Sequence, residues 1–519
     1  MIFSANRFLW SSFLLPLFSG LLSALSWQSD MLFFLQLVAL VPFFMAIRSV
    51  TEVADTFFKK LIRLFAAVVC YKTSFLLLAT GWMYEVSPSV LVLDILIENL
   101  LFTFLLSILL FRKISFSAVV CLWVIYEFLM QRLFILSPFY LLGYSWANRI
   151  ELIQYYSFLG IEGGSLIILL VNYAVFNIIK NKRIKRFEVI VFSVLVSVSA
   201  FSLLKFYSSR KYAFDKEVKI SVIHTEIQSK TENYLKYPEQ LIRGVDSVSL
   251  PNSLVILPEV FFNSLGWTGG FADNKVVREI DSLSQLKHQN YLLGAYVFSQ
   301  TNELTPQSRP LAGYNINYNT HNVSILLDDK ISIKSKQIFI PFQEYVPDNF
   351  LAQWINQYIS NIGDDRKISV LETMDEFEYK KKRFDVLLCY ESLYPRVVAE
   401  RAASNDFMVI QANEEWHESE RCSRLYLNTN KAAAIQSGIP FFRVSNHGYS
   451  AVILPDGVEK DLFRTGKQYS VLESFLPEAR SSFLIYDNIK GYSYLICLLF
   501  LLWIFIKNSN YFKETPFRK

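Results

Sequence analysis

Three short motifs in the second half of the chain contain residues that could do acid–base or nucleophilic chemistry. The first is Leu-Pro-Glu at 257–259, which puts Glu259 directly after an apolar run of strand length. Partial burial disfavours the charged form of a carboxylate, and this would make Glu259 a proton acceptor near neutral pH. The alternative interpretation is an acid that complements the dipole at a helix start.

The second motif runs from Lys334 to Pro347, where Lys336 and Glu344 bracket an apolar strip. A lysine that points into an apolar site can stabilise a developing oxyanion. Taken alone, this motif also fits an edge strand with solvated charges.

The third motif is Phe384-Asp-Val-Leu-Leu-Cys-Tyr-Glu391, in which an apolar strand ends at Cys389 and a helix is predicted to begin near Ser392. The positive end of a helix lowers a thiol pKa from its ordinary value of about 8.5. Cys389 is therefore the best nucleophile candidate, with a buried structural cysteine as the alternative. We interpret Cys422, in the charged run 418–424, as incidental.

Other chemistries have little support. The five histidines show no paired metal-ligand spacing, so we expect no metal. No phosphate-binding glycine loop occurs, and the sequon Asn322-Val-Ser324 is of a kind that often arises by chance. The net charge of +5 predicts no nucleic-acid partner.

The three motifs lie in a polar region, 212–488, whose pattern of strands and helices predicts an α/β domain with catalytic groups at strand ends. The predicted strands are 218–223, 254–257, 291–298, 323–327, 384–388, 407–412, 441–445 and 451–454. The predicted helices are 233–248, 273–289, 394–404 and 427–437.

The composition of the chain indicates that its remaining part contains membrane-spanning helices. The 519 residues are 52% hydrophobic and 19% charged, against about 25% charged in soluble domains. A bilayer core needs roughly 20 apolar residues in a helix. The segments that fit are 8–27, 31–47, 61–83, 89–111, 116–136, 164–180, 188–206 and 492–507.

The Lys and Arg residues of the short connections predict the orientation of these segments. With the N-terminus in the cytoplasm, sixteen of these cations lie on the cytoplasmic side and about two on the other. Seven crossings then place 212–488 outside the cytoplasm, and an eighth returns the tail. A helix count wrong by one would invert this arrangement.

In order and spacing, Glu259, Lys336 and Cys389 resemble the Glu-Lys-Cys triad of the nitrilase (carbon-nitrogen hydrolase) superfamily. The whole chain resembles the apolipoprotein N-acyltransferase family of the bacterial inner membrane. The segments that carry this resemblance are 19–27, 40–43, 141–148, 341–347, 389–391 and 443–448.

The resemblance implies a multi-pass α-helical membrane domain of about eight helices and an α/β nitrilase-like four-layer αββα sandwich. The domains would be 1–206 with seven helices, 212–488 as the extracytoplasmic (periplasmic) catalytic domain, and 489–519 with the last helix and a cytoplasmic tail. The resemblance also implies no cofactor. Membrane phospholipid would be the acyl donor and diacylated apolipoproteins the acceptors, and we expect a monomer.

Roles carried over from the family make Glu259 the general base, Lys336 the oxyanion stabiliser and Cys389 the nucleophile, which would hold the acyl chain as a thioester. Supporting active-site positions match Glu344, Tyr390 and Glu391. An apolar strip of Phe261, Phe262, Leu265, Trp267 and Phe271 would form a mobile lid, or else ordinary core beside a turn. Further possible lipid contacts are Phe342 and Trp416.

The chain departs from the family at several positions, and these departures bear on donor and acceptor preference more than on reaction type. Leu257 stands where the family has Trp, His224-Thr-Glu226 replaces Gln-Gly-Asn, and Ala433-Ala-Ile-Gln436 replaces Arg-Ala-x-Glu. The stretch 413–416 reads Asn-Glu-Glu-Trp in place of Asn-Asp-x-Trp. Two alternative functions stay open: a membrane-tethered nitrilase-type amidase, and a catalytically inactive membrane scaffold.

Overall fold

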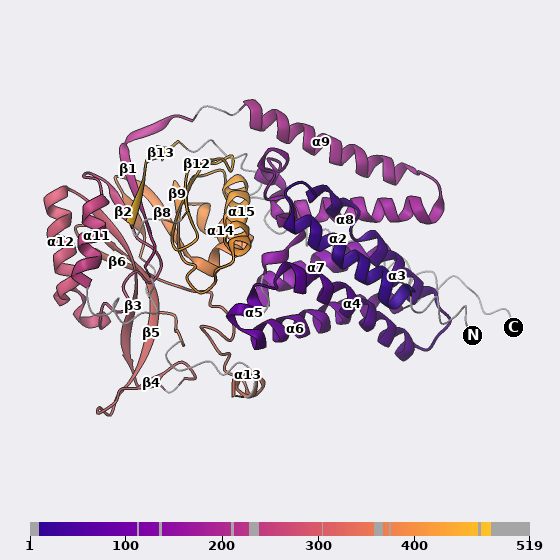
Figure 1. Ribbon diagram of the computed structural model, residues 1–519, viewed down its shortest axis with the longest axis horizontal. Coiled ribbons are helices and arrows are strands. Elements are labelled where there is room, and N and C mark those ends of the chain that lie inside the picture. The colour runs from indigo at the N-terminus through magenta and orange to yellow at the C-terminus, as the bar shows by residue number, and fades with distance from the viewer. Residues whose placement is uncertain are drawn as a thin grey trace, which may run out of the picture. The chain divides into compact units, whose positions relative to one another are not determined.

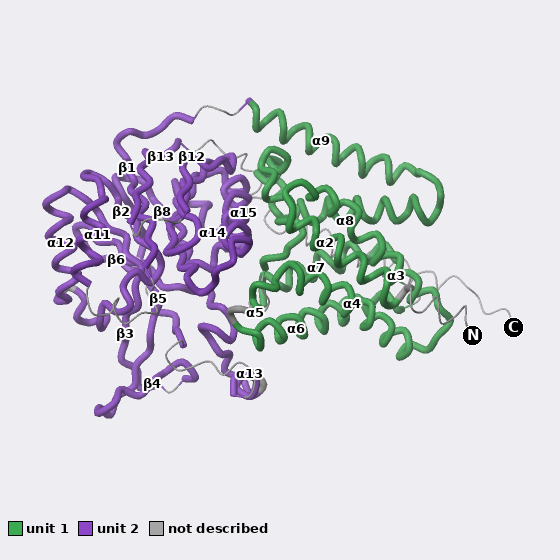
Figure 2. The backbone as a smooth tube through the Cα atoms, in the orientation of Figure 1, with its two compact units in different colours: residues 1–207, 485–519 green, residues 208–484 purple. Residues whose placement is uncertain are grey.

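The computed structural model describes residues 10–111, 114–133, 138–208, 212–227, 238–303, 305–357, 367–372, 375–464 and 469–478. The chain divides into two compact units (Figure 2). One comprises residues 1–207 and 485–519, and the other comprises residues 208–484.

The first unit is helical throughout its described part (Figure 1). Its α-helices are α2 (Leu15–Gln28), α3 (Val41–Glu52), α4 (Phe57–Ala79), α5 (Met83–Val86), α6 (Pro88–Leu106), α7 (Ala118–Leu133), α8 (Tyr156–Asn181) and α9 (Arg186–Ser208). Short 3₁₀ helices lie between several of them, among them η2 (Phe33–Leu37), which leads into α3.

Each of the first seven predicted apolar segments overlaps a helix, and 492–507 lies outside the described residues. Five helices within those described are long and apolar enough to cross a membrane, namely Phe33–Glu52, Phe57–Ala79, Pro88–Leu110, Tyr156–Asn181 and Arg186–Ser208. The first segment forms a shorter apolar helix, Ser12–Gln28. The fifth segment forms the 16-residue α7. Seven crossings before the polar unit therefore stay a prediction.

One buried ion pair joins helices inside this unit. Lys72 on α4 contacts Glu98 on α6 at 2.7 Å and donates to the Tyr126 hydroxyl of α7 at 2.9 Å. The Tyr126 hydroxyl in turn donates to Glu98 at 3.0 Å, and all three side chains are buried. These contacts join three helices and explain how ionisable residues are accommodated in apolar segments.

The second unit is built on a mixed sheet of thirteen strands in two halves. Its strands are β1 (Phe214–Thr225), β2 (Leu254–Ile256), β3 (Asn290–Thr301), β4 (Arg309–Pro310), β5 (Asn317–Leu327), β6 (Ile331–Ser335), β7 (Phe377–Tyr379), β8 (Lys382–Leu388), β9 (Phe407–Asn413), β10 (Phe441–Asn446), β11 (Tyr449–Ile453), β12 (Glu459–Arg464) and β13 (Tyr469–Pro477).

One half has the parallel strands β1, β2 and β3 at its centre, with β13 antiparallel to β1 and β5 antiparallel to β3. β6 pairs antiparallel with β5. The other half has parallel β8, β9 and β10, flanked by β7 on one side and by β11 with β12 on the other. The halves are joined where Thr225 at the end of β1 pairs with Asn446 at the end of β10.

Three apolar clusters show that these halves form a four-layer αββα sandwich. The central cluster brings Val222 and Ile256 of one half together with Val386 and Val409 of the other. A second cluster packs α11 (Pro238–Val248) and α12 (Lys275–Lys287) against the outer face of the first half. A third packs α14 (Pro395–Ala402) and α15 (Glu420–Ser437) against the second half. Figure 1 shows these helix pairs flanking the strands.

Local sequence signals set the helix ends. Asn274 caps α12 by accepting from the Val276 amide at 2.8 Å, and the helix ends at His288 in the left-handed conformation. Ser419 caps α15, and Gly438, at φ 71°, ends it. Every predicted strand and helix of this unit overlaps an observed element. The strands β4, β6, β7, β12 and β13 and the short α13 (Phe350–Ile355) were not predicted.

Candidate active site

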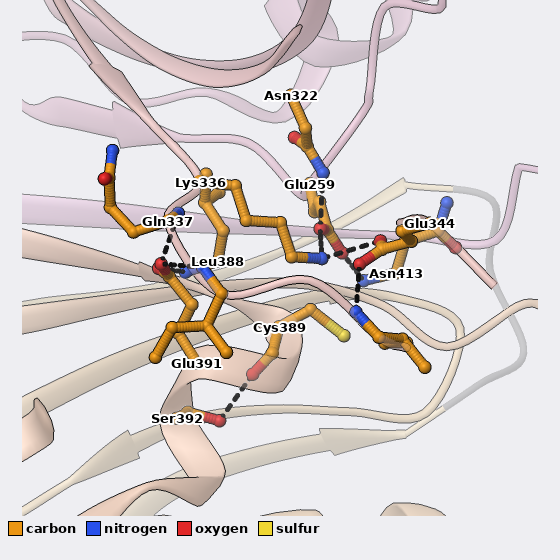
Figure 3. Close-up of polar contacts among 12 residues, drawn as sticks. Glu259, Asn322, Lys336, Gln337, Glu344, Leu388, Cys389, Glu391, Ser392 and Asn413 are labelled. Carbon is orange, nitrogen blue, oxygen red and sulfur yellow. Dashed lines mark hydrogen bonds and ion pairs between the residues drawn. The ribbon is translucent and has the colours of Figure 1, made fainter. Parts of the chain in front are cut away.

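Strand ends deliver the three candidate catalytic residues to one place (Figure 3). Glu259 comes three residues after β2, Lys336 directly follows β6, and Cys389 directly follows β8. These strands belong to both halves of the sheet, so the site is assembled from segments that are far apart in sequence.

Lys336 lies between two carboxylates. Its ammonium nitrogen is 2.9 Å from Glu259 Oε1 and 2.7 Å from Glu344 Oε1. The Lys336 side chain is fully buried, and those of Glu259 and Glu344 are 5% and 18% exposed. Burial alone would lower the lysine pKa, but the two carboxylates reverse this and hold it well above its ordinary value. The alternative interpretation, an edge strand with solvated charges, is wrong for Lys336, whose side chain is fully buried.

Neutral donors hold the two carboxylates in place. Asn322 Nδ2 on β5 donates to Glu259 Oε1 at 2.8 Å, and the Asn413 backbone N–H at the end of β9 donates to Oε2 at 3.2 Å. The Ile340 N–H donates to Glu344 Oε2 at 2.9 Å. With both oxygens held, the Glu259 carboxylate has little rotational freedom. Burial raises the pKa of the Glu344 carboxyl, and this effect outweighs the opposing charge of the adjacent Lys336.

Cys389 occupies a strained elbow. Its φ of 48° lies in the left-handed region, which a residue with a Cβ rarely adopts. The Ser392 hydroxyl donates to the Cys389 carbonyl at 2.7 Å and stabilises the turn. The residues after the strand form a 3₁₀ helix, Cys389–Leu393, and the next α-helix starts only at Pro395.

The expectation that a helix dipole lowers the Cys389 pKa was therefore wrong. Burial, and then the charges of Glu259 and Glu344, raise the thiol pKa to about 12, although Lys336 and the Asn413 N–H act in the opposite direction. A five-residue 3₁₀ helix has few aligned peptide dipoles, so it does little to offset the effect of burial on the thiol pKa. A thiol with a raised pKa needs a neighbouring base in order to act as a nucleophile, and Glu259 and Glu344 are the carboxylates whose charges act on it.

Glu391 holds the surrounding backbone. Its carboxylate is fully buried, and it accepts from the Gln337 amide at 2.8 Å and from the Leu388 amide at 2.9 Å. The predicted supporting role of Glu391 thus has a structural basis: it contacts the segments that carry Lys336 and Cys389. Tyr390 is buried and packs edge-on against Tyr394.

The predicted lid residues lie mainly in the core. Phe261 and Phe262 are 2% and 3% exposed, and both belong to the cluster beneath α11 and α12 together with Leu265 and Phe271. Side chains buried in this way have no surface to offer to lipid, so the alternative interpretation as core applies to these four. Trp267 is 39% exposed and packs on Phe298 and Tyr318.

The two other candidate lipid contacts also have internal neighbours. Phe342 is buried, with φ 56°, in the turn that follows the Lys336 segment. Trp416 is half-buried and packs edge-on against His417. Within the described part of the chain, no group of three or more His, Cys, Asp or Glu residues is arranged to hold a metal ion.

Sequence reasoning missed three polar residues that shape the site. Asn322 was noticed only as a sequon, although its place on a strand of apolar residues is a signal for a buried partner. Asn413 contributes its backbone N–H to the site. Almost every residue has such a group, so the residue type does not indicate this role. Arg401 pairs with Glu391, ten residues earlier. In the sequence it looks like an arginine on the exposed face of a helix, so nothing local marks it as the partner of a buried carboxylate.

Comparisons with known proteins agree with this architecture. Residues 19–174 match the family model of the apolipoprotein N-acyltransferase N-terminal domain. The apolipoprotein N-acyltransferase of Haemophilus ducreyi is 23% identical over 371 residues, covering 69% of both chains. That of Rickettsia prowazekii is 22% identical over 418 residues, covering 76% of both.

Two solved structures are similar to part of this chain. A CN-hydrolase superfamily protein from Xanthomonas campestris is 16% identical, with a TM-score of 0.31, and the match covers 54% of this chain and 96% of that one. An amidase from Nesterenkonia is 14% identical, with a TM-score of 0.32, and the match covers 50% of this chain and 93% of that one.

Proposed function

Because this chain belongs to the apolipoprotein N-acyltransferase family, we propose that it transfers an acyl chain from a membrane phospholipid to the α-amino group of the S-diacylglyceryl cysteine of apolipoproteins. The acyl chain passes through a thioester on Cys389. The observation that carries this proposal is a buried thiol beside a buried lysine that is clamped by two carboxylates.

In the first half-reaction, Glu259 removes the Cys389 proton while the sulfur attacks an ester carbonyl of the phospholipid. Negative charge develops on the carbonyl oxygen, and the Lys336 ammonium and backbone N–H groups stabilise it. When the intermediate collapses, the C–O bond breaks, Glu259 returns the proton to the leaving oxygen, and lysophospholipid departs. The acyl chain is then a thioester on Cys389.

In the second half-reaction, the acceptor amine attacks the thioester carbonyl. Glu259 accepts the proton that the amine loses, Lys336 again stabilises the oxyanion, and the C–S bond breaks. The proton passes from Glu259 to the Cys389 sulfur, and the product is an amide. Because an amide is more stable than a thioester, this order of steps makes the transfer effectively irreversible.

The positions of the charges in the sequence support the location we propose, which is a bacterial inner membrane with residues 208–484 on the periplasmic side. Lys and Arg concentrate in the connections assigned to the cytoplasm. Both substrates are lipids, and each CH₂ group kept in the bilayer saves about 0.8 kcal/mol. A catalytic unit that follows a series of apolar helices in the chain meets such substrates without extracting them.

The test incubates the purified protein with a phospholipid labelled in its acyl chains and a synthetic diacylated lipopeptide. We expect label on Cys389, as a thioester that hydroxylamine removes, and then label on the lipopeptide amine. Release of labelled free fatty acid without lipopeptide acylation would instead indicate a hydrolase that uses water as acceptor. Full function of Cys389→Ala in cells would indicate a scaffold.

A further inference from the structure

One buried carboxylate connects the two segments on which the proposed chemistry depends. Glu391 Oε1 accepts from the backbone N–H groups of Gln337 at 2.8 Å and Ile338 at 3.3 Å. Its Oε2 accepts from the Leu388 N–H at 2.9 Å. Gln337 directly follows Lys336, and Leu388 directly precedes Cys389, so Glu391 links the chain at the cation to the chain at the nucleophile (Figure 3).

A fully buried carboxylate needs a counter-charge as well as neutral donors. Arg401 on α14 supplies it: one guanidinium nitrogen lies 3.0 Å from Oε2 and the other 3.1 Å from Oε1 of Glu391. The first nitrogen also donates to the Val386 carbonyl on β8 at 2.9 Å. This is a bidentate pair, in which both the distance and the plane of the carboxylate are fixed.

Arg401 does not take part in the proposed chemistry directly. The charged groups with the largest effect on the Cys389 thiol are Glu259, Lys336 and Glu344, and Arg401 is not among them. Its effect on the reaction must therefore pass through Glu391 and the backbone that Glu391 holds. The guanidinium is one-fifth exposed, at the solvent edge of the link.

We propose that Arg401 is a positioning residue, which locks Glu391 and thereby fixes the separation between the Lys336 ammonium and the Cys389 sulfur. The expected effect on the rate of thioester formation rests on the proposed function, but the expected effect on the backbone that Glu391 holds does not. Oxyanion stabilisation depends on donors that are in place before charge develops, and misplacement by about 1 Å can cost roughly 100-fold in rate. Lysine cannot replace the bidentate contact, because it offers a single point charge.

The variants are Arg401→Gln and Arg401→Lys, with Arg396→Gln as the matched control. Arg396 lies on the same helix and pairs with the exposed Glu400 at 2.6 Å, so its loss tests a general effect of removing an α14 arginine. Formation of the Cys389 thioester from labelled phospholipid is followed in single turnovers. We expect Arg401→Gln to lower the maximal rate about 100-fold with little change in the donor concentration at half-maximal rate. Arg401→Lys should fall between it and the wild type, and Arg396→Gln should stay within about twofold.

Two further measurements separate positioning from other roles. Amide hydrogen exchange should rise at residues 337, 338 and 388 in Arg401→Gln and not in Arg396→Gln, while strands β1 and β13 stay protected. The pH midpoint of Cys389 alkylation should be unchanged, since Arg401 acts on geometry rather than on the thiol's charge balance.

Three results would overturn the inference: wild-type thioester rates in both Arg401 variants, unchanged exchange at the three amides, or a shifted alkylation midpoint. If Arg401→Gln does not fold, Arg401→Lys supplies the same readouts. If the wild-type protein forms no thioester, the proposed function fails, and the exchange measurement alone decides whether Arg401 holds the backbone.

Discussion

Replacing Glu344 with glutamine should make the Cys389 thiol more acidic. Burial raises its pKa to about 12 with the help of the negative charges of Glu259 and Glu344, and Lys336 opposes them. Glu344→Gln removes one negative charge but leaves a side chain of the same size, so the thiolate becomes less unfavourable. Lys336→Met removes the cation that most strongly favours the thiolate, so it should shift the thiol pKa upward.

The expected size follows from the proximity of the groups. A neighbouring charge within about 4–6 Å typically moves a pKa by about 1–3 units. Part of the change is offset, because freeing Lys336 from Glu344 strengthens its pairing with Glu259. We therefore expect Glu344→Gln to lower the thiol pKa by about 1 unit, which means about tenfold more thiolate at a given pH below the pKa.

The assay is the rate of Cys389 alkylation by iodoacetamide between pH 7 and pH 10, quantified by mass spectrometry of the peptide that contains Cys389. Cys389→Ser controls for alkylation elsewhere. Glu344→Gln should react faster than the wild type at every pH in this range, and Lys336→Met should react more slowly. Equal rates in the three proteins, or slower alkylation of Glu344→Gln, would refute the charge balance described here.

Three further changes test other parts of the structure. Lys72→Met leaves the buried Glu98 carboxylate without its cation. This should cost about 3–5 kcal/mol of stability and lower the unfolding temperature in detergent. Lys72→Met combined with Glu98→Leu should recover most of the lost stability, and a double variant as unstable as the single one would contradict this explanation. Asn322→Ala removes the 2.8 Å hydrogen bond to Glu259, the proposed base. A hydrogen bond to a charged group contributes about 1.5–3 kcal/mol, so thioester formation should slow about 10–100-fold. An unchanged single-turnover rate would exclude a role for the Asn322 amide. His288→Gly relieves the φ of 53° at an exposed helix end, a left-handed conformation that costs a residue with a Cβ about 1–2 kcal/mol. The greater freedom of glycine in the unfolded chain offsets about 0.4–1 kcal/mol of this gain. We therefore expect a small net stabilisation, seen as a higher midpoint in thermal unfolding, and a lower midpoint would contradict this.

Much of the fold was predictable because its signals are local. The strand before Glu259 is a short, fully buried apolar run, and the strand before Cys389 ends in the buried apolar run 386–388, as buried parallel strands do. The apolar segments of the membrane unit are recognisable from length and hydropathy alone. Among the strands missed by prediction, β4 and β7 are short, and β12 alternates between partly buried and exposed residues at an edge.

The surroundings of the candidate site were not predictable in the same way. Lys336 and Glu259 are 77 residues apart, and their contact exists only because β5 and β6 fold back beside β2 and β3. The expectation of an acidic thiol failed for a related reason. Burial of Cys389 depends on the packing of distant segments, and the local sequence does not reveal whether the chain continues as a 3₁₀ turn or an α-helix.

By itself, the sequence determined which residue types follow which strands and where apolar helices occur, because backbone periodicity and hydrophobicity act over a few residues. Only the tertiary structure decided that Lys336 has two carboxylate partners, that burial raises the pKa of the Cys389 thiol, and that Arg401 pairs with Glu391. These properties depend on charge separation and exclusion of water in three dimensions. Such quantities are set by contacts between residues that are remote in the chain.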